Sequence, residues 1–275
     1  PTTIQVTQKI FPISLGTKYN NTMERIKVLV ETMDWMMGEL GHFSIIVRKN
    51  AYVTVDWGDG SPLQTIIGTG ERQDPDHDYK HRLPIRQFEV VITAQEDGTI
   101  LHFYLGFIDM WTLSVDASEC PQLPSLGASW ACKVNVKGCY GLTEFECGGE
   151  NIEELDLTGC CNLEVLNIRG AMKLKTLNLT PCPKLRSLEC ECCFALTRIT
   201  LSRDCKLQTL IANSAEYLEE RIRPAELRFI RQILHQNGGD IKYTDVETLE
   251  LTKETKKIDK KLLNRLLAKY GPILG

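Results

Sequence analysis

Residues 152–206 divide into five blocks of eleven: IEELDLTGCCN, LEVLNIRGAMK, LKTLNLTPCPK, LRSLECECCFA and LTRITLSRDCK. Each block begins with Ile or Leu and carries mostly apolar residues at its fourth and sixth positions. A unit of the form L-x-x-L-x-L is typical of a short strand that buries alternate side chains. A short fixed period predicts that such strands stack around one continuous core as a solenoid. Solenoids display long regular surfaces, so the repeat favours binding over catalysis.

Alternate blocks differ in kind, so the full period is two blocks. One series is followed by a turn that carries a cysteine, and successive turn cysteines are 19, 21, 22 and 23 residues apart. These separations are close to the roughly 20–29 residues per turn of leucine-rich repeats. We therefore expect five turns, each with two strands on opposite walls, in a stack roughly 24 Å long. The turn cysteines are Cys120, Cys139, Cys160, Cys182 and Cys205.

The eleven cysteines all lie between Cys120 and Cys205, and an odd number cannot pair completely within one chain. Their recurrence once per turn predicts a ladder in which each thiol donates weakly to a carbonyl of the neighbouring turn. Cys147 and Cys190 occupy inward positions, where a buried thiol behaves as a small apolar group. A zinc cluster is the alternative, but its members lack the paired C-x₂-C spacing of zinc sites. Those members would be Cys182, Cys190, Cys192, Cys193 and Cys205.

Composition narrows the class of protein. A length of 275 residues predicts about two domains, and 43% hydrophobic with 25% charged residues is ordinary for globular chains. The net charge of −4 argues against a nucleic-acid partner. No apolar run reaches the ~18 residues of a transmembrane helix. Because no G-x-S-x-G, H-E-x-x-H, P-loop or G-x-G-x-x-G motif occurs, we predict no catalytic residue, metal or cofactor.

A different kind of β region precedes the repeats. Residues 42–48, 51–56, 87–93 and 99–105 are rich in β-branched and aromatic residues that partly alternate, which predicts four strands. Residues 25–32 fit a helix or a strand, and we favour a strand.

The segment Val53–Ser61, VTVDWGDGS, resembles the signature of PKD domains, which are Ig-like β-sandwiches. In that family an H-x-Y element and a further strand follow, and His77-Asp-Tyr79 and Phe88–Ile92 match them. Arg86 replaces a family glycine, and the insertion Pro62–Pro75 is longer than in the family. The resemblance implies that Trp57 fills the sandwich core while the glycines form a tight turn. The motif residues are Asp56, Trp57, Gly58, Asp59, Gly60, His77 and Tyr79.

The combination of a PKD-like region with repeats that carry turn cysteines resembles the leucine-rich-repeat surface proteins of gut Bacteroidetes. This resemblance covers residues 25 to about 215. It implies an extracytoplasmic adhesion or binding protein without catalytic residues, attached to the membrane only through a possible lipid anchor upstream of residue 1. The ligand would be a protein or a carbohydrate, and we expect a monomer.

The solenoid faces offer weak candidates for ligand contact. Trp and Tyr are enriched in binding sites, but aromatic residues in the first turns could equally seal the junction between domains, which we favour. The charged outward residues could contact a ligand or form a solvated face, and the second interpretation is favoured for the acidic ones. The candidates are Trp111, Trp130, Tyr140, Glu153, Glu154, Asp156, Lys175 and Arg198.

An enzymatic alternative depends on the loop Asp74–His81, DPDHDYKH, which could serve a metal-dependent hydrolase or a hydrolase accessory domain. Asp56 and Asp59 could join this loop in a structural Ca²⁺ site. We favour a polar loop with structural hydrogen bonds, because the ligands lie on one loop without a remote partner.

After Ala212 the repeat is lost. Residues 223–236 predict an amphipathic helix with Pro224 in its first turn, and residues 258–267 carry a second helical stripe. Leu227, Ile230 and Leu234 form the stripe that would cover the open end of the solenoid. The predicted fold is thus mainly β: an Ig-like, PKD-like sandwich (1–105), a leucine-rich-repeat solenoid (106–215) and an α-rich C-terminal cap (216–275).

Overall fold

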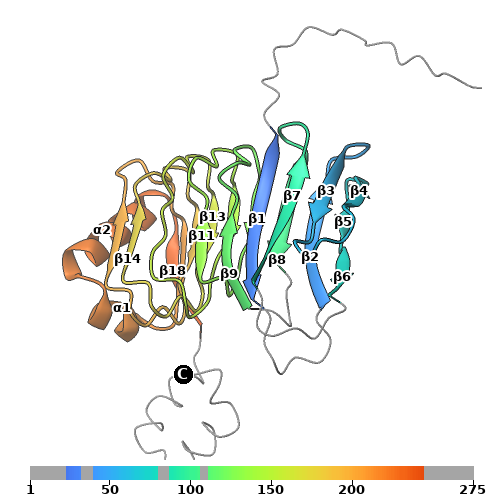
Figure 1. Cartoon of the computed structure of the whole chain (residues 1–275). Helices are drawn as coiled ribbons and strands as arrows, with labels where there is room; N and C mark the ends of the chain where they lie inside the picture. Colours follow the sequence, from blue (N-terminus) through green and yellow to red (C-terminus); the bar gives the residue numbers. More distant parts are fainter. Residues whose placement is uncertain (1–22, 32–39, 80–86, 106–110, 245–275) are drawn as a thin grey trace, which may run out of the picture.

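The computed structural model describes residues 23–31, 40–79, 87–105 and 111–244, and every structural statement below concerns these residues. The protein is mainly β, with a solenoid-like stack of about five turns between a two-layered N-terminal part and a helical end (Figure 1). The helical stripe expected at 258–267 and residue His81 lie outside the described residues.

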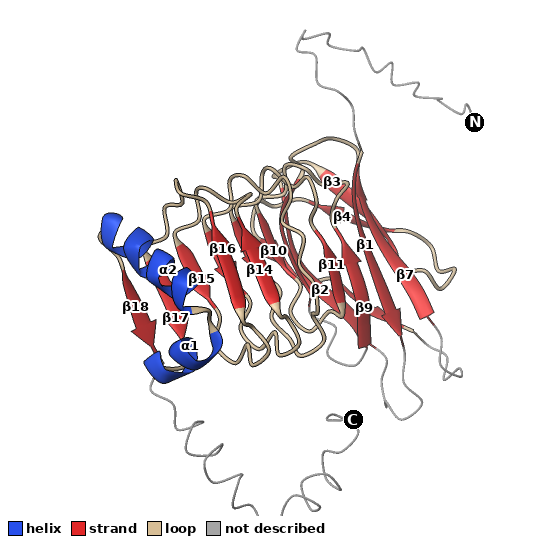
Figure 2. Cartoon of the chain, turned by 90° about the vertical axis from the view of Figure 1, so that its left-hand side faces the viewer, coloured by secondary structure: helices blue, strands red, loops and turns tan. Residues whose placement is uncertain are grey.

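Two long sheets face each other across the core. The first contains six strands in the order β11-β9-β1-β7-β3-β4. Its strands are β1 (Glu24–Glu31), β3 (Tyr52–Asp56), β4 (Gln64–Ile67), β7 (Gln87–Ala94), β9 (Trp111–Asp116) and β11 (Lys133–Asn135). A separate pair, β14 (Thr176–Leu179) with β16 (Arg198–Leu201), lies further along the same wall of the solenoid (Figure 2).

The second sheet contains ten strands in the order β18-β17-β15-β13-β12-β10-β8-β2-β5, with β6 also paired to β2. From the N-terminal part come β2 (Leu40–Val47), β5 (Arg72–Gln73), β6 (Asp76–Asp78) and β8 (Ile100–Leu105). The solenoid and the C-terminal end contribute β10 (Ser125–Gly127), β12 (Glu144–Glu146), β13 (Val165–Asn167), β15 (Ser187–Glu189), β17 (Thr209–Ala212) and β18 (Asp240–Tyr243).

Residues 25–32 illustrate how side-chain alternation selects a strand. In β1 the side chains of Ile26, Val28 and Val30 are fully buried, while those between them are partly exposed. A period of two fits a strand with one face on the core, and β1 pairs antiparallel with β7 along its whole length. The predicted strand is therefore confirmed. The four other N-terminal strands predicted from the sequence also form, as β2, β3, β7 and β8.

The N-terminal part and the repeats share both sheets. Strand β1 pairs antiparallel with β9, and β8 pairs in parallel with β10, so hydrogen bonding continues across the change from antiparallel to parallel strands. The buried side chains of both parts also belong to one continuous cluster. The boundary near residue 105 therefore separates antiparallel from parallel strand pairing, and both kinds of strand share one core.

The expectation of two strands in every turn is wrong in one place. Residues 152–157 form no strand, although Ile152, Leu155 and Leu157 are buried as predicted. Ten residues separate Phe145 from Leu155, whereas eleven separate the corresponding Leu166 and Leu177 of the next turn. This difference does not account for the lost pairing, because only eight residues separate Leu126 from Val134 and β11 still pairs with β9.

The predicted ladder forms in part: all five turn cysteines are buried, and Cys139, Cys160 and Cys205 donate to a carbonyl of the preceding turn. Cys139 Sγ donates to Ala117 O at 3.3 Å, and Cys160 Sγ donates to Val136 O at 3.3 Å. Each acceptor belongs to the preceding turn, so the thiols help to tie successive turns together. All eleven cysteines are free thiols. Burial raises the pKa of Cys139 to about 12 and that of Cys160 to about 11, which keeps both protonated.

Two helices cover the end of the solenoid (Figure 2). The predicted helix forms as α2 (Pro224–Gln236), and Leu227, Ile230 and Leu234 on its inner face are buried. A second helix, α1 (Ala215–Arg221), was not predicted; Ser214 begins it by accepting a hydrogen bond from Tyr217 N.

Candidate functional site

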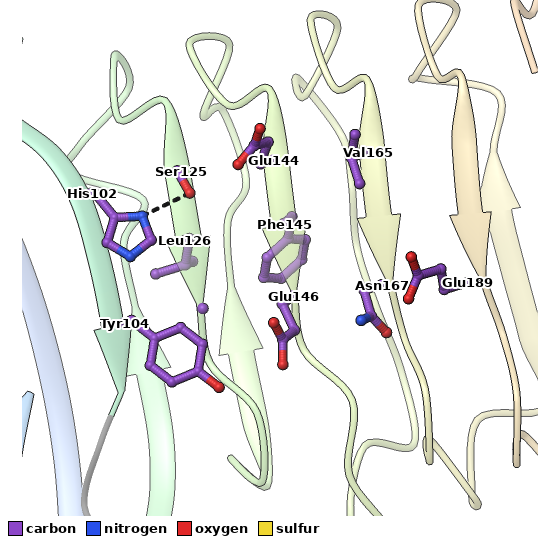
Figure 3. A pocket seen from close by; sticks show the side chains of 11 residues that line it. His102, Tyr104, Ser125, Leu126, Glu144, Phe145, Glu146, Val165, Asn167 and Glu189 are labelled. Atoms are coloured by element: carbon purple, nitrogen blue, oxygen red, sulfur yellow. Dashed lines mark hydrogen bonds between the residues drawn. The ribbon is translucent and has the colours of Figure 1, made fainter. Parts of the chain in front are cut away.

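An open hollow of about 210 Å³ lies on the outer face of the ten-stranded sheet, across strands β8, β10, β12, β13 and β15 (Figure 3). This volume is smaller than the roughly 300–1,000 Å³ of pockets that enclose a drug-sized ligand. The hollow therefore suits a ligand that lies along the surface. Its lining residues are His102, Tyr104, Ser125, Leu126, Gly127, Glu144, Phe145, Glu146, Val165, Asn167 and Glu189.

The register of the parallel strands arranges these side chains in rows. Residues at corresponding positions of successive strands lie side by side, about 4.8 Å apart. One outward row contains His102, Ser125, Glu144 and Val165. The other contains Tyr104, Gly127, Glu146, Asn167 and Glu189. Between them lies a row of residues whose side chains are buried in the core: Phe103, Leu126, Phe145, Leu166 and Leu188.

Two aromatic rings form one end of the hollow. His102 and Tyr104 are two residues apart on β8, with ring centroids 6.5 Å apart and planes only 6° from parallel. The rings are seen face-on when the sheet is viewed from outside (Figure 3). Tyr104 lies across Gly127, where an added Cβ would come within 2.1 Å of the ring. The glycine thus allows the Tyr104 ring to lie flat over the neighbouring strand.

A buried carboxylate fixes the start of the strand that carries both rings. Glu24 is fully buried, and its carboxylate accepts hydrogen bonds from the backbone N–H groups of Gly98, Thr99 and Ile100 at 2.6–3.1 Å. Desolvation by burial raises the pKa of Glu24, although these three hydrogen bonds oppose that shift.

The polar groups of the hollow include both hydrogen-bond donors and acceptors. His102 Nδ1 and Ser125 Oγ are 2.8 Å apart, and Ser129 Oγ donates to Glu146 Oε1 at 2.6 Å. Asn167 and three glutamates add amide and carboxylate groups. Among the described residues, no basic side chain forms an ion pair with Glu144, Glu146 or Glu189.

Burial shifts the titration of several groups in the hollow. It lowers the pKa of His102 below its usual value of 6.5, so the imidazole is neutral at neutral pH. Burial and then the Glu146 carboxylate raise the pKa of Tyr104, which keeps its hydroxyl protonated. Burial, followed by repulsion from Glu191 and Glu146, raises the pKa of Glu189.

The geometry of the hollow supports binding better than bond cleavage. Its three glutamates project from one sheet face, whereas glycoside hydrolysis uses two carboxylates on opposite sides of the scissile bond. The arrangement provides an aromatic surface beside two rows of polar groups. Such a surface holds a ligand by stacking and hydrogen bonding.

The charged candidates from the sequence lie elsewhere. Glu153, Glu154 and Lys175 are exposed on the wall opposite the hollow. Asp156 accepts a hydrogen bond from Thr158 N at 2.9 Å, which lowers the pKa of its carboxyl group and indicates a structural turn. The remaining candidate, Arg198, forms an ion pair with Glu226 of α2 at 3.2 Å.

For two of the three aromatic candidates, the structure contradicts the junction role that the sequence favoured. Trp130 is 71% exposed and Tyr140 47% exposed, so neither seals the junction. Trp130 also has a positive φ of 69°, which is rare for a bulky residue. Trp111 lies in β9, but its side chain is not among those described.

The residues of the PKD-like motif form a compact cluster. Trp57 is 1% exposed and packs against His77, with ring centroids 5.0 Å apart. Tyr79 Oη donates to Trp57 O at 2.9 Å, and His77 Nε2 lies 2.8 Å from Asp59 Oδ2. The nearby turn also has a structural explanation: Asp56 Oδ1 accepts a hydrogen bond from Gly58 N at 2.9 Å, and both Gly58 and Gly60 have positive φ.

The loop proposed for metal chemistry is used for structure. Asp74 accepts hydrogen bonds from Ser44 Oγ at 2.5 Å and from Arg72 Nε at 2.9 Å, while His77 contacts Trp57 and Asp59. In the described segments, no group of three His, Cys, Asp or Glu side chains is placed to hold a metal ion.

His102 and Tyr104 were missed by the sequence analysis. The strand at 99–105 was predicted, but its outward side chains were not assigned to a site. The alternation in Ile100-Leu-His-Phe-Tyr-Leu105 places the two rings on one face and was the available signal.

The chain matches no known protein family, no characterised protein and no solved structure. Within the described part, no helix is both long and apolar enough to cross a membrane.

Proposed function

We propose that this protein is a non-enzymatic binding or adhesion protein of the cell exterior, and that it presents the outer face of the ten-stranded sheet to a protein or glycan ligand. The observation that carries this proposal is the hollow in that face, with its two aromatic rings and three glutamates that form no ion pair with a described residue. Aromatic and polar groups converging on a depression are typical of ligand sites.

The proposed family relation is that of a leucine-rich-repeat surface protein with an N-terminal PKD-like domain. The buried Trp57, the Tyr79 hydrogen bond to its carbonyl and the regular turn cysteines support it. The proposed extracytoplasmic location rests on the same family resemblance. Buried thiols are compatible with an oxidising exterior, because burial raises their pKa and the thiolate is the reactive form.

The test is a screen of the whole chain against arrays of glycans and of extracellular proteins. Variants Tyr104→Ala and Glu144→Lys change the proposed face, and Lys175→Ala on the opposite wall is the matched control. We expect a reproducible hit that both face variants weaken and the control leaves unchanged. A hit insensitive to both face variants would refute the proposed surface, and turnover of a substrate lost in His77→Ala would refute the non-enzymatic assignment.

A further inference from the structure

We infer that the ligand of this face is a saccharide, stacked on Tyr104 and His102 and hydrogen-bonded by the two polar rows. This inference rests on the proposed binding function and names the ligand class. It begins from the orientation of the rings, whose planes are within 6° of each other and face outward from the sheet (Figure 3). A flat aromatic surface of this kind suits the flat apolar face of a sugar ring.

The mixture of polar groups favours a saccharide over a cationic peptide. An ammonium or guanidinium group only donates hydrogen bonds, whereas a sugar hydroxyl both donates and accepts. The hollow offers carboxylate acceptors on Glu144 and Glu189, a protonated hydroxyl on Tyr104 and the amide of Asn167. This combination of donors and acceptors is matched best by hydroxyl groups.

The shape of the hollow indicates a chain of sugars. It crosses five strands, which at a spacing of ~4.8 Å gives a length of roughly 19 Å along the sheet. Between the polar rows the floor is the sheet itself, since the side chains of Leu126 and Phe145 are buried in the core, and the hollow is therefore elongated and shallow. An oligosaccharide lying across the strands fits these dimensions.

Trp130 is a strongly exposed aromatic residue close in the chain to the residues of the hollow. It stands on the turn after β10, directly beside Ser129, whose hydroxyl bonds to Glu146 in the hollow. Equivalent positions of the next two turns are Gly149 and Gly170, which also have positive φ. A bulky, 71% exposed residue at a position suited to glycine is strained, and such strain is concentrated at binding sites.

The experiment measures binding of the whole chain to a glycan array, followed by calorimetric titration with the oligosaccharide that binds best. Hexa-arginine serves as the cationic probe. The variants are Tyr104→Ala, Tyr104→Phe, Trp130→Gly and Glu144→Gln, with Lys175→Ala as the control. Thermal melting of each variant shows that it is folded, and Trp130→Gly removes only an exposed side chain.

We expect Tyr104→Ala and Trp130→Gly each to weaken saccharide binding about tenfold, while Tyr104→Phe stays within about threefold because it retains the ring. Glu144→Gln should also retain most of the saccharide affinity, since an amide oxygen still accepts. Salt-sensitive binding of hexa-arginine that Glu144→Gln abolishes, without saccharide binding, would overturn the inference and leave the binding function intact. Binding to array proteins alone, weakened by the variants of this face, would also overturn the saccharide inference and leave the binding function intact. If the chain binds neither a glycan nor a protein on the arrays, both the saccharide inference and the proposed binding function are overturned.

Discussion

Trp57 connects the two sheets of the N-terminal part. Its ring lies 5.5 Å from that of Phe43 on β2, and its indole Nε1 donates to Gln64 Oε1 on β4 at 2.9 Å. His77 covers the indole on another side, and Tyr79 bonds to its backbone carbonyl. One side chain thus contacts residues of both sheets: Gln64 in the first, and Phe43 and His77 in the second.

Replacement of Trp57 by Ala should lower the free energy of unfolding by about 3–5 kcal/mol, because it leaves a cavity in this cluster. Urea denaturation followed by circular dichroism measures the change. Tyr52→Ala, at a side chain that is 50% exposed on the preceding strand β3, is the control and should cost much less. Equal losses in the two variants would contradict the structural role of Trp57.

Asp59 makes stability depend on pH. Burial acts to raise its pKa, but hydrogen bonds from His77 and Ser61 outweigh burial and lower the pKa to about 2. A carboxyl group with a folded pKa below its ordinary value of 3.8 stabilises the protein above that value, and this contribution is lost as pH falls toward 2. Asp59→Asn should therefore lower the melting temperature at pH 6, and the difference from the unmodified protein should shrink by pH 2.5. A difference that is constant over this range would contradict the assignment.

At the scale of the strand and turn, the cysteine ladder predicts thiol reactivity. Denatured, unreduced protein should titrate with close to eleven thiols, because all are free. In the native protein, Cys161 should react fast with a disulfide reagent at pH 8, since it is exposed, whereas buried members such as Cys139 should react slowly. Several native disulfides found by mass spectrometry would contradict the ladder.

The C-terminal helix substitutes for a missing strand. Glu226 Oε2 accepts a hydrogen bond from Ile199 N at 3.2 Å, a backbone group of β16 at the open end of its sheet. Glu226→Ala should cost about 1–3 kcal/mol, because it removes the partner of this N–H group. The exposed pair Glu219–Arg231 provides a control, Glu219→Ala, which should cost about 0–1 kcal/mol.

Removal of the whole cap gives a second test at this scale. Truncation after residue 215 should yield associating or insoluble protein, because it exposes the core and the edge of β17. Light scattering measures association. A monomeric truncated protein with an unchanged melting transition would show that the helices do not act as a cap.

The sequence was most informative where one pattern repeats. The period of eleven residues, the inward leucines and the amphipathic stripe of α2 each depend on local spacing, and the structure confirms them. Helix α1 was missed because it is only seven residues long, and its Ser214 cap was the main signal. The segment 152–157 has the same apolar spacing as its neighbours but forms no strand, so periodicity alone did not distinguish it.

At the scale of the molecule, both sheets of the N-terminal part continue into the solenoid, the ten-stranded sheet through all of its turns and the six-stranded sheet as far as β11. The site depends on this continuity, since β8 supplies both rings and the solenoid strands supply the polar rows. The sequence could not place them together, because the pairing of β8 with β10 is a long-range contact that no local pattern encodes.

Shared sheets predict cooperative unfolding. Calorimetry and circular dichroism should detect a single transition for the N-terminal part and the first turns, because separating them exposes the edges of β1 and β8 to water. A fragment ending at residue 105 should fail to fold as a monomer. Two well-separated transitions, or a folded monomeric fragment, would show that the parts are independent.

The parallel stacking of the turns also bears on how such a protein could change over generations. Each inner turn contacts only the turn before it and the turn after it, while the rings of β8 and the helical cap stay at the two ends. Duplication of one unit of about 22 residues would lengthen the outer face by ~4.8 Å and alter neither end. Descendants of one gene could thereby be matched to longer or shorter ligands by unequal recombination, without any new fold.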